Sequence, residues 1–280
     1  MVEMSLPSTI DRLYAVSTVK LPMRGSHTAQ MGWQLNHAFE KQKLDLAVLA
    51  VDAYSLMGPP QEMEEIYEYL WNDNLLDDVY YLLNRDVVLV KIPKILKNRK
   101  KSLEGKRDNM YQWTDIVFSE KSVLDTVIFE KQREMIPADT RLERSTENIE
   151  KHLLPQIKEH PETHFLLYMP PYSAAYWFLM QRGGLIEQQM RSRLRLCELC
   201  LEYDNVEIYD FSSRTEWICN LDEYFDYSHH STKISNELFE AMARGENRVN
   251  SLTDLFEGNA RIKESVDWFA NRYEPKGEEF

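Results

Sequence analysis

One short segment in the last quarter of the chain contains the residue types of an acid-base pair. Asp226 stands three residues before His229, in the stretch Asp226-Tyr227-Ser228-His229. A carboxylate at this spacing can meet the imidazole within one turn of chain, fix its tautomer and leave the other ring nitrogen as a base. Such a base activates a serine hydroxyl, so the pattern indicates half of a serine-dependent active site. The same spacing also occurs in ordinary surface turns and helix caps.

Short apolar runs and long helical patterns alternate along the chain. This alternation predicts a parallel sheet covered by helices on both faces, which is a three-layer α/β/α domain. The clearest strands are Leu46–Val51, His164–Met169 and Val206–Phe211, because each run is short and nearly continuously apolar. Val16–Met23 is predicted as a weaker strand, and Met1–Met4 as the stub of another.

One domain is expected for residues 1–280, with a charged tail over 274–280. Residues 58–138 differ in composition, being rich in Tyr, Trp, Asn and Asp and then in Lys and Arg, and we interpret them as a helical insertion between the third and fourth strands. The predicted helices are Ala29–Lys41, Arg141–His160, Ala174–Tyr203 with an interruption at Gly183-Gly184, Lys233–Arg244 and Arg261–Tyr273.

Composition excludes several classes of protein. Hydrophobic residues make up 43% of the 280 residues, which is enough to build a core and unlike a disordered chain. The 33 Lys and Arg against 46 Asp and Glu give a formal charge of -13, which disfavours nucleic acid and repels anionic membranes unless a local patch reverses the field. Residues 97–101 (Lys-Asn-Arg-Lys-Lys) are such a basic run, either a solvated surface or a docking patch.

The cysteines and the apolar runs add two further exclusions. Cys197, Cys200 and Cys219 form neither a metal-ligand quartet nor a disulfide framework. No apolar run approaches the length of about eighteen residues that a membrane span needs, and residues 1–9 do not have the pattern of an export signal. As written, the sequence predicts a cytoplasmic protein that needs no cofactor.

In an open parallel sheet, binding sites form where loops leave the carboxyl ends of the strands. Four places in the sequence follow predicted strands in this way. They are Ser5, Gly25-Ser26-His27, Asp52, and the loop from Asp226 to His229. We expect Asp226 and His229 to lie within hydrogen-bond reach at this edge of the sheet, with Gly25 and Asp52 on neighbouring loops.

The order of these elements and the stretch from Asn220 to Ser231 (NLDEYFDYSHHS) resemble the SGNH (GDSL-like) hydrolases. The likeness is to the polysaccharide-associated, SGNH-like branch from bacteria, and it covers about Leu21 to Ala241. Further matches are Val51-Asp52-Ala53-Tyr54-Ser55, Tyr69-Leu70-Trp71-Asn72-Asp73-Asn74, Tyr81-Leu82-Leu83-Asn84 and Pro170-Pro171-Tyr172-Ser173.

The resemblance implies a flavodoxin-like sheet and an esterase or O-acyltransferase that acts on acyl groups of a glycan or small ester. It makes His229 the general base and Asp226 its orienting partner. Gly25 matches the family's glycine, whose backbone N–H helps to bind an oxyanion. The family's nucleophile lies in a Gly-x-Ser segment after the first strand, and here Ser5 is the candidate, with Glu3 in the place of the glycine.

The sequence also departs from the family. Asp52 stands where a third-strand asparagine normally donates to the oxyanion, whereas an ionised carboxylate only accepts hydrogen bonds and repels the developing charge. Fuller family members begin with a membrane anchor or export segment. The resemblance therefore implies an extracytoplasmic, membrane-anchored protein if that segment has been lost.

Three hypotheses follow. In the first, Ser5, His229 and Asp226 form a serine hydrolase or acyltransferase site. In the second, the chain keeps the fold without catalysis and binds a glycan or a protein through aromatic residues of the insertion, namely Tyr67, Tyr69, Trp71, Tyr80 and Tyr81. In the third, a metal is held by Asp226, His229, His230 and His27, which requires a kinked loop because adjacent histidines diverge on a regular element.

Overall fold

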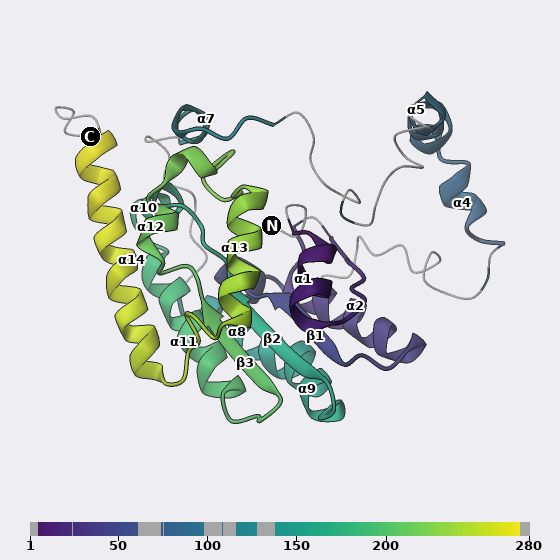
Figure 1. Cartoon of the computed structure of the whole chain (residues 1–280), viewed down its shortest axis with the longest axis horizontal. Coiled ribbons are helices and arrows are strands. Elements are labelled where there is room, and N and C mark those ends of the chain that lie inside the picture. Colours follow the sequence, from purple (N-terminus) through teal and green to yellow (C-terminus); the bar gives the residue numbers. More distant parts are fainter. Residues whose placement is uncertain are drawn as a thin grey trace.

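Three parallel strands form the sheet in the computed structural model (Figure 1). They are β1 (Leu46–Ala50), β2 (His164–Met169) and β3 (Val206–Asp210), in the order β1-β2-β3. In the register, Leu46 lies opposite His164 and Phe165 lies opposite Val206. The α/β class and the three clearest predicted strands are therefore confirmed. The structure describes residues 5–23, 25–60, 74, 76–97, 108, 116–127 and 138–274.

The sheet is buried on both faces because side chains of its strands alternate between two apolar clusters. In β2, Leu166 and Tyr168 belong to one cluster, while Phe165, Leu167 and Met169 belong to the other. This arrangement is compatible with a three-layer α/β/α domain. The cluster around Leu166 includes residues of α1 (Pro7–Tyr14), α7 (Glu120–Leu124), α10 (Ala174–Arg182), α12 (Thr215–Ile218), α13 (Thr232–Ala243) and α14 (Leu252–Tyr273).

The opposite cluster is built mainly from helices that precede or connect the strands. Helix α11 (Ile186–Cys200) supplies residues to both clusters, since Ile186 and Met190 face one and Leu196 and Cys197 face the other. The further elements of this cluster are α2 (Thr28–Lys41), α3 (Ala53–Leu56), the π-helical turn η5 (Ile149–Leu153) and α9 (Leu154–Glu159), and α8 (Ala138–Asn148) packs against α11.

The predicted helices are present, with shifted ends. The helix predicted over Arg141–His160 contains the π turn η5, in which the N–H of Leu154 donates to the carbonyl of Ile149. Pro155 follows at once and has no N–H to give, so the helix accommodates it by this local widening. The break predicted at Gly183-Gly184 separates α10 from α11.

The strand predicted over Val16–Met23 is wrong, because residues 16–23 form no regular element. Side chains hold part of this segment against the start of the chain: the N–H of Thr18 donates to Asp11, and Lys20 Nζ donates to the carbonyl of Ser5. Within the described ranges no strand pairs with the outer edge of β1. The sequence pattern also missed helix α1. The stub predicted at Met1–Met4 lies outside the described residues.

The predicted insertion over 58–138 is described only in part. Its described elements include α4 (Val79–Leu82), the π turn η3 (Val87–Lys91) and α5 (Ile92–Lys97), which stand away from the sheet in Figure 1. Helix α7 near its end packs on the body, since Val123 is fully buried and the N–H of Ser119 donates to the carbonyl of Tyr224. Residues 275–280 of the predicted tail lie outside the described part.

A buried ion pair joins the end of β3 to the surrounding helices. Arg193 Nη2 on α11 lies 2.7 Å from Asp210 Oδ2, and both side chains are almost fully buried. Arg193 also donates to Asn259 on α14, and Asp210 accepts from the N–H of Ser212. A buried charge is tolerated only with such partners, so this cluster depends on close packing. Gly258 permits it, because a Cβ there would lie 2.5 Å from Asp210 Oδ2.

Gly258→Ala should therefore destabilise the protein. In an open helix this change stabilises by about 1 kcal/mol, but here the added methyl group collides with the ion pair and should cost about 1–3 kcal/mol. Urea unfolding monitored by circular dichroism measures the change. Glu257→Ala, at the exposed neighbouring position, is the matched control and should change the free energy of unfolding by less than about 0.5 kcal/mol. A Gly258→Ala protein as stable as the original would contradict the packing described.

Candidate active site at the carboxyl edge of the sheet

The loop that carries the predicted acid-base pair is closed by its own backbone. An isolated antiparallel bridge joins Tyr224 to His230, and the N–H of Phe225 donates to the carbonyl of His229 at 2.9 Å. Inside the loop, Asp226 Oδ1 accepts from the N–H groups of Ser228 and His229, both at 2.8 Å. These bonds form an Asx-type turn, the structure that an aspartate favours locally. The turn brings Asp226 back toward the ring of His229.

The two side chains are hydrogen-bonded. His229 Nδ1 lies 2.8 Å from Asp226 Oδ2, which confirms the predicted contact. Partial burial acts to raise the pKa of Asp226, but the hydrogen bond and charge of His229 and the two backbone N–H groups outweigh it and lower that pKa to about 2. Asp226 is thus an ionised acceptor, so the geometry assigns the proton to Nδ1 and leaves Nε2 as the basic nitrogen.

Side chains connect the loops that follow the three strands. After β1, Asp52 Oδ2 accepts from the hydroxyl of Tyr172, which follows β2, at 2.5 Å. The Ser173 hydroxyl donates to the carbonyl of Tyr227 at 2.7 Å, in the loop of the acid-base pair. The three loops therefore form one connected edge, as the sequence predicted for the carboxyl ends of the strands. The linking role of Tyr172 was not predicted, although its place directly after Pro170-Pro171 at a strand end was a usable signal.

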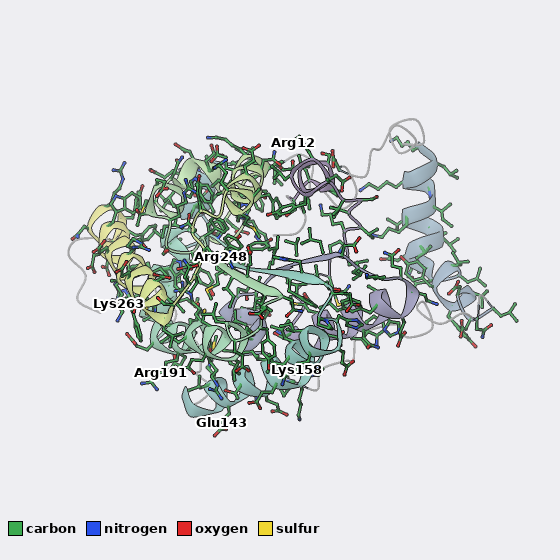
Figure 2. All side chains as sticks on the ribbon, turned by 60° about the horizontal axis from the view of Figure 1, so that its bottom comes forward. Arg12, Glu143, Lys158, Arg191, Arg248 and Lys263 are labelled. Carbon is green, nitrogen blue, oxygen red and sulfur yellow. The ribbon has the colours of Figure 1, made fainter. Side chains whose placement is uncertain are left out.

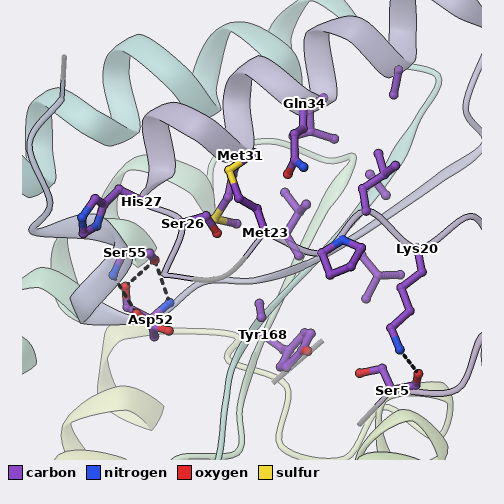
Figure 3. Close-up of a pocket in the computed structure, with 18 of the residues that line it drawn as sticks. Ser5, Lys20, Met23, Ser26, His27, Met31, Gln34, Asp52, Ser55 and Tyr168 are labelled. Atoms are coloured by element: carbon purple, nitrogen blue, oxygen red, sulfur yellow. Dashed lines mark hydrogen bonds between the residues drawn. The ribbon is translucent and has the colours of Figure 1, made fainter. Parts of the chain in front are cut away.

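A cavity of about 1700 Å³ opens at this edge, and Figure 3 shows part of it. Its lining includes Ser5, Gly25, Asp52 and His229, so the structure brings four of the predicted site residues to one cavity. The cavity continues along the outer edge of β1, with which no strand of the described part of the chain pairs. It is therefore elongated along the sheet rather than confined to the acid-base pair.

Asp52 has a structural function in the cavity wall. As the N-cap of α3, its Oδ1 accepts from the N–H of Ser55 at 2.7 Å, while its Oδ2 accepts from Tyr172. Burial, together with the negative charge of Asp52, raises the pKa of Tyr172 well above its usual value, so this phenol stays a donor. Both oxygens of Asp52 thus accept hydrogen bonds, as expected for a carboxylate that does not donate to an oxyanion.

Ser5 shares the cavity with His229 but is not hydrogen-bonded to it. It is buried beside Tyr168, whose pKa is raised by burial. In Figure 3, Ser5 lies at the far side of the view from Asp52 and His27, with Tyr168 between them. No hydrogen bond in the described residues joins Ser5 to His229. A reaction at Ser5 would therefore need a hydrogen bond to His229 that the described part of the structure does not contain.

The segment before α2 reaches the opposite end of the cavity. Gly25 has φ +63°, the left-handed conformation that favours glycine, and His27 caps α2. Ser26 lies between them and lines the cavity (Figure 3). The sequence marked Gly25-Ser26-His27 as a loop at a strand end but did not predict Ser26 as a nucleophile.

The metal hypothesis gains no support from the described residues. His230 is buried, its Nδ1 lies 3.1 Å from the carbonyl of Ser231, and burial lowers its pKa to about 3. His27 packs against Gly58, where a Cβ would lie 2.1 Å from the ring. Among the ranges described, no group of three or more His, Cys, Asp or Glu side chains is placed to hold a metal ion.

No protein-family model matches the chain, and neither a curated protein nor a solved structure is similar enough to match it. The resemblance to SGNH hydrolases thus stays a prediction from sequence motifs, and the functional argument rests on the geometry of the site. Of the helices described, none is long and apolar enough to cross a membrane.

The ionised state of Asp226 predicts a specific dependence of stability on pH. The pKa of Asp226 in the folded protein, about 2, lies below the ordinary value of 3.8. The ionised carboxylate therefore stabilises the fold above pH 4, and this stabilisation is lost as the pH falls through about 2. The shift corresponds to at most about 2 kcal/mol, which solvent screening of this partly exposed pair reduces to about 1 kcal/mol. The stability of the original protein should therefore exceed that of Asp226→Asn by this amount at pH 6, and the difference should shrink toward pH 2. Urea unfolding from pH 2 to pH 6 measures it, and a difference that does not change with pH would contradict the assignment.

Proposed function

We propose that the chain is a flavodoxin-like, SGNH-type serine esterase or O-acyltransferase that acts on acyl groups of a glycan or small ester. The observation that supports this proposal is the hydrogen bond between Asp226 and His229 at the carboxyl edge of the sheet, beside a cavity that also contains serine side chains. An imidazole whose tautomer is held by a carboxylate is the base that a serine hydroxyl needs.

The proposed reaction proceeds in two acyl-transfer steps. His229 Nε2 takes the proton of a serine hydroxyl while the serine oxygen attacks the carbonyl carbon of the ester. The resulting imidazolium is stabilised by Asp226 and returns the proton to the departing alcohol. Water or an acceptor hydroxyl then attacks the acyl-serine, His229 again takes and returns the proton, and the serine is restored. In this scheme the backbone N–H of Gly25 donates to the oxyanion.

Ser5 is the proposed nucleophile, and Ser26 provides a matched control because it lines the same cavity. A fluorophosphonate probe should add its mass to the peptide that contains Ser5. Ser5→Ala should abolish labelling, and so should His229→Ala, because the hydroxyl loses its base. Ser26→Ala should leave labelling intact. Peptide mass spectrometry reads the result, and labelling at Ser26 in place of Ser5 would overturn the assignment while preserving a serine hydrolase.

Asp52 should limit the rate of the proposed enzyme. Removal of one oxyanion donor typically costs about a hundred- to a thousand-fold in turnover. Asp52→Asn supplies a neutral amide donor and can still cap α3, so it should raise the rate of hydrolysis of a small acetyl ester by about tenfold or more. Tyr172→Phe removes the hydrogen bond to Asp52 but keeps the carboxylate, and should give no increase. Initial rates against pH, with His229→Ala as the blank, test this.

A non-catalytic binding protein is the second candidate function. Two observations favour it: Ser5 is buried against Tyr168, and Asp52 is a carboxylate with both oxygens engaged. Such a chain would bind a glycan or a protein partner, with Tyr80 and Tyr81 exposed on α4 as contact residues. If a folded protein is not labelled, and if the original and Asp52→Asn both hydrolyse no faster than His229→Ala, this candidate replaces the enzyme.

A further inference from the structure

Residues 76–97, which we term the arm, expose large apolar side chains to water. Leu76 is 83% exposed, Tyr80 73%, Leu83 71%, Leu89 63% and Leu96 64%. In Figures 1 and 2 the helices of the arm stand away from the body of the domain. A concentration of large exposed apolar side chains in one segment is unfavourable in water and is typical of an interaction site.

In the continuous helical segment formed by η3 and α5, apolar and basic side chains lie on different faces. Val88, Ile92 and Leu96 recur every four residues through η3 and α5, which places them on one face. Lys91, Lys94 and Lys97 recur every three residues on another side. This is the distribution of an amphipathic helix that lies in the plane of a membrane surface, because its apolar face enters the acyl boundary while the lysines reach the headgroups.

The second half of the arm and the residues that follow it are basic, in contrast to the chain as a whole. The arm itself contains four Lys and Arg against three Asp, whereas residues 85–107, which extend past it, contain nine Lys and Arg but only two Asp and Glu, which gives +7 within a chain of -13. A basic segment next to exposed apolar side chains complements an anionic lipid surface. Because the arm projects from the body, it can meet such a surface without bringing the acidic body into contact with it.

We propose that the arm docks the protein onto an anionic membrane surface as an interfacial amphipathic segment. Leu89, Ile92 and Leu96 enter the bilayer interface, and Lys91, Lys94 and Lys97 pair with lipid phosphates. Tyr80 and Tyr81 lie at the level of the headgroups, where tyrosine is favoured. This inference uses no residue of the cavity and does not depend on the proposed acyl transfer.

Vesicle co-sedimentation of the full chain tests the proposal. The original protein should bind vesicles of phosphatidylglycerol and phosphatidylcholine, should not bind pure phosphatidylcholine, and should bind more weakly at 0.5 M than at 0.1 M NaCl. Lys91→Glu/Lys94→Glu/Lys97→Glu should reduce the partition coefficient by about a hundredfold or more. Leu89→Ser/Ile92→Ser/Leu96→Ser should also reduce binding, because the apolar contribution is lost.

A matched control distinguishes the effect of the arm lysines from the effect of the protein's net charge. Lys158→Glu/Arg191→Glu/Lys263→Glu makes the same charge change at exposed positions on the body, which Figure 2 labels, and should keep most of the binding. Circular dichroism of every variant confirms that it is folded. The proposal is overturned if the original protein does not bind the anionic vesicles, or if the control loses as much binding as the arm variants. Self-association that depends on the arm, measured by sedimentation velocity in the absence of lipid binding, would assign the arm to a protein interface instead.

Discussion

The buried ion pair between Arg193 and Asp210 is the constraint on which the arrangement of the other elements depends. Asp210 ends β3, so the pair holds the carboxyl end of that strand against α11, while the bond from Arg193 to Asn259 adds α14. The guanidinium also lies over the ring of Trp177 on α10, at 5.8 Å from the ring centroid. Removal of either charge would leave the other buried without an opposite charge, which is far more costly than loss of a surface pair. The loops of the candidate site leave the sheet at the edge that this cluster holds in place.

The candidate site is preorganised by the same bonds that form its loop. Asp226 accepts hydrogen bonds from two backbone N–H groups and from the ring nitrogen Nδ1 of His229, so one carboxylate both forms the turn and orients the base. The loop is then attached to its neighbour through Ser173 and Tyr227. An acid-base pair held in this way needs little reorganisation when a substrate binds, which is the property that favours catalysis.

Along the outer edge of β1, the cavity wall contains both polar and apolar groups. The carbonyl of Asp45 and the N–H of Val51 hydrogen-bond to β2. In a parallel pair, alternate residues of a strand direct their backbone groups to opposite sides. The N–H and C=O groups of Leu46, Val48 and Ala50 therefore face away from β2, toward the cavity. The cavity wall therefore offers backbone donors and acceptors beside apolar side chains, a combination found in binding sites for ligands that are only partly polar.

The sequence by itself determined the features that depend on residues close together in the chain. Apolar runs predicted β1, β2 and β3, and the three-residue spacing of Asp226 and His229 was enough for their contact, because a short turn leaves few alternatives. Only the tertiary structure decided the rest. Asp52 and Tyr172 are 120 residues apart and still bond to each other, and Ser5 is buried beside Tyr168 without a hydrogen bond to His229 in the described residues, because of packing that no local pattern encodes. Residues 16–23 likewise form no strand, although within the described ranges no strand pairs with the outer edge of β1, because Thr18 and Lys20 bond instead to Asp11 and Ser5 near the start of the chain.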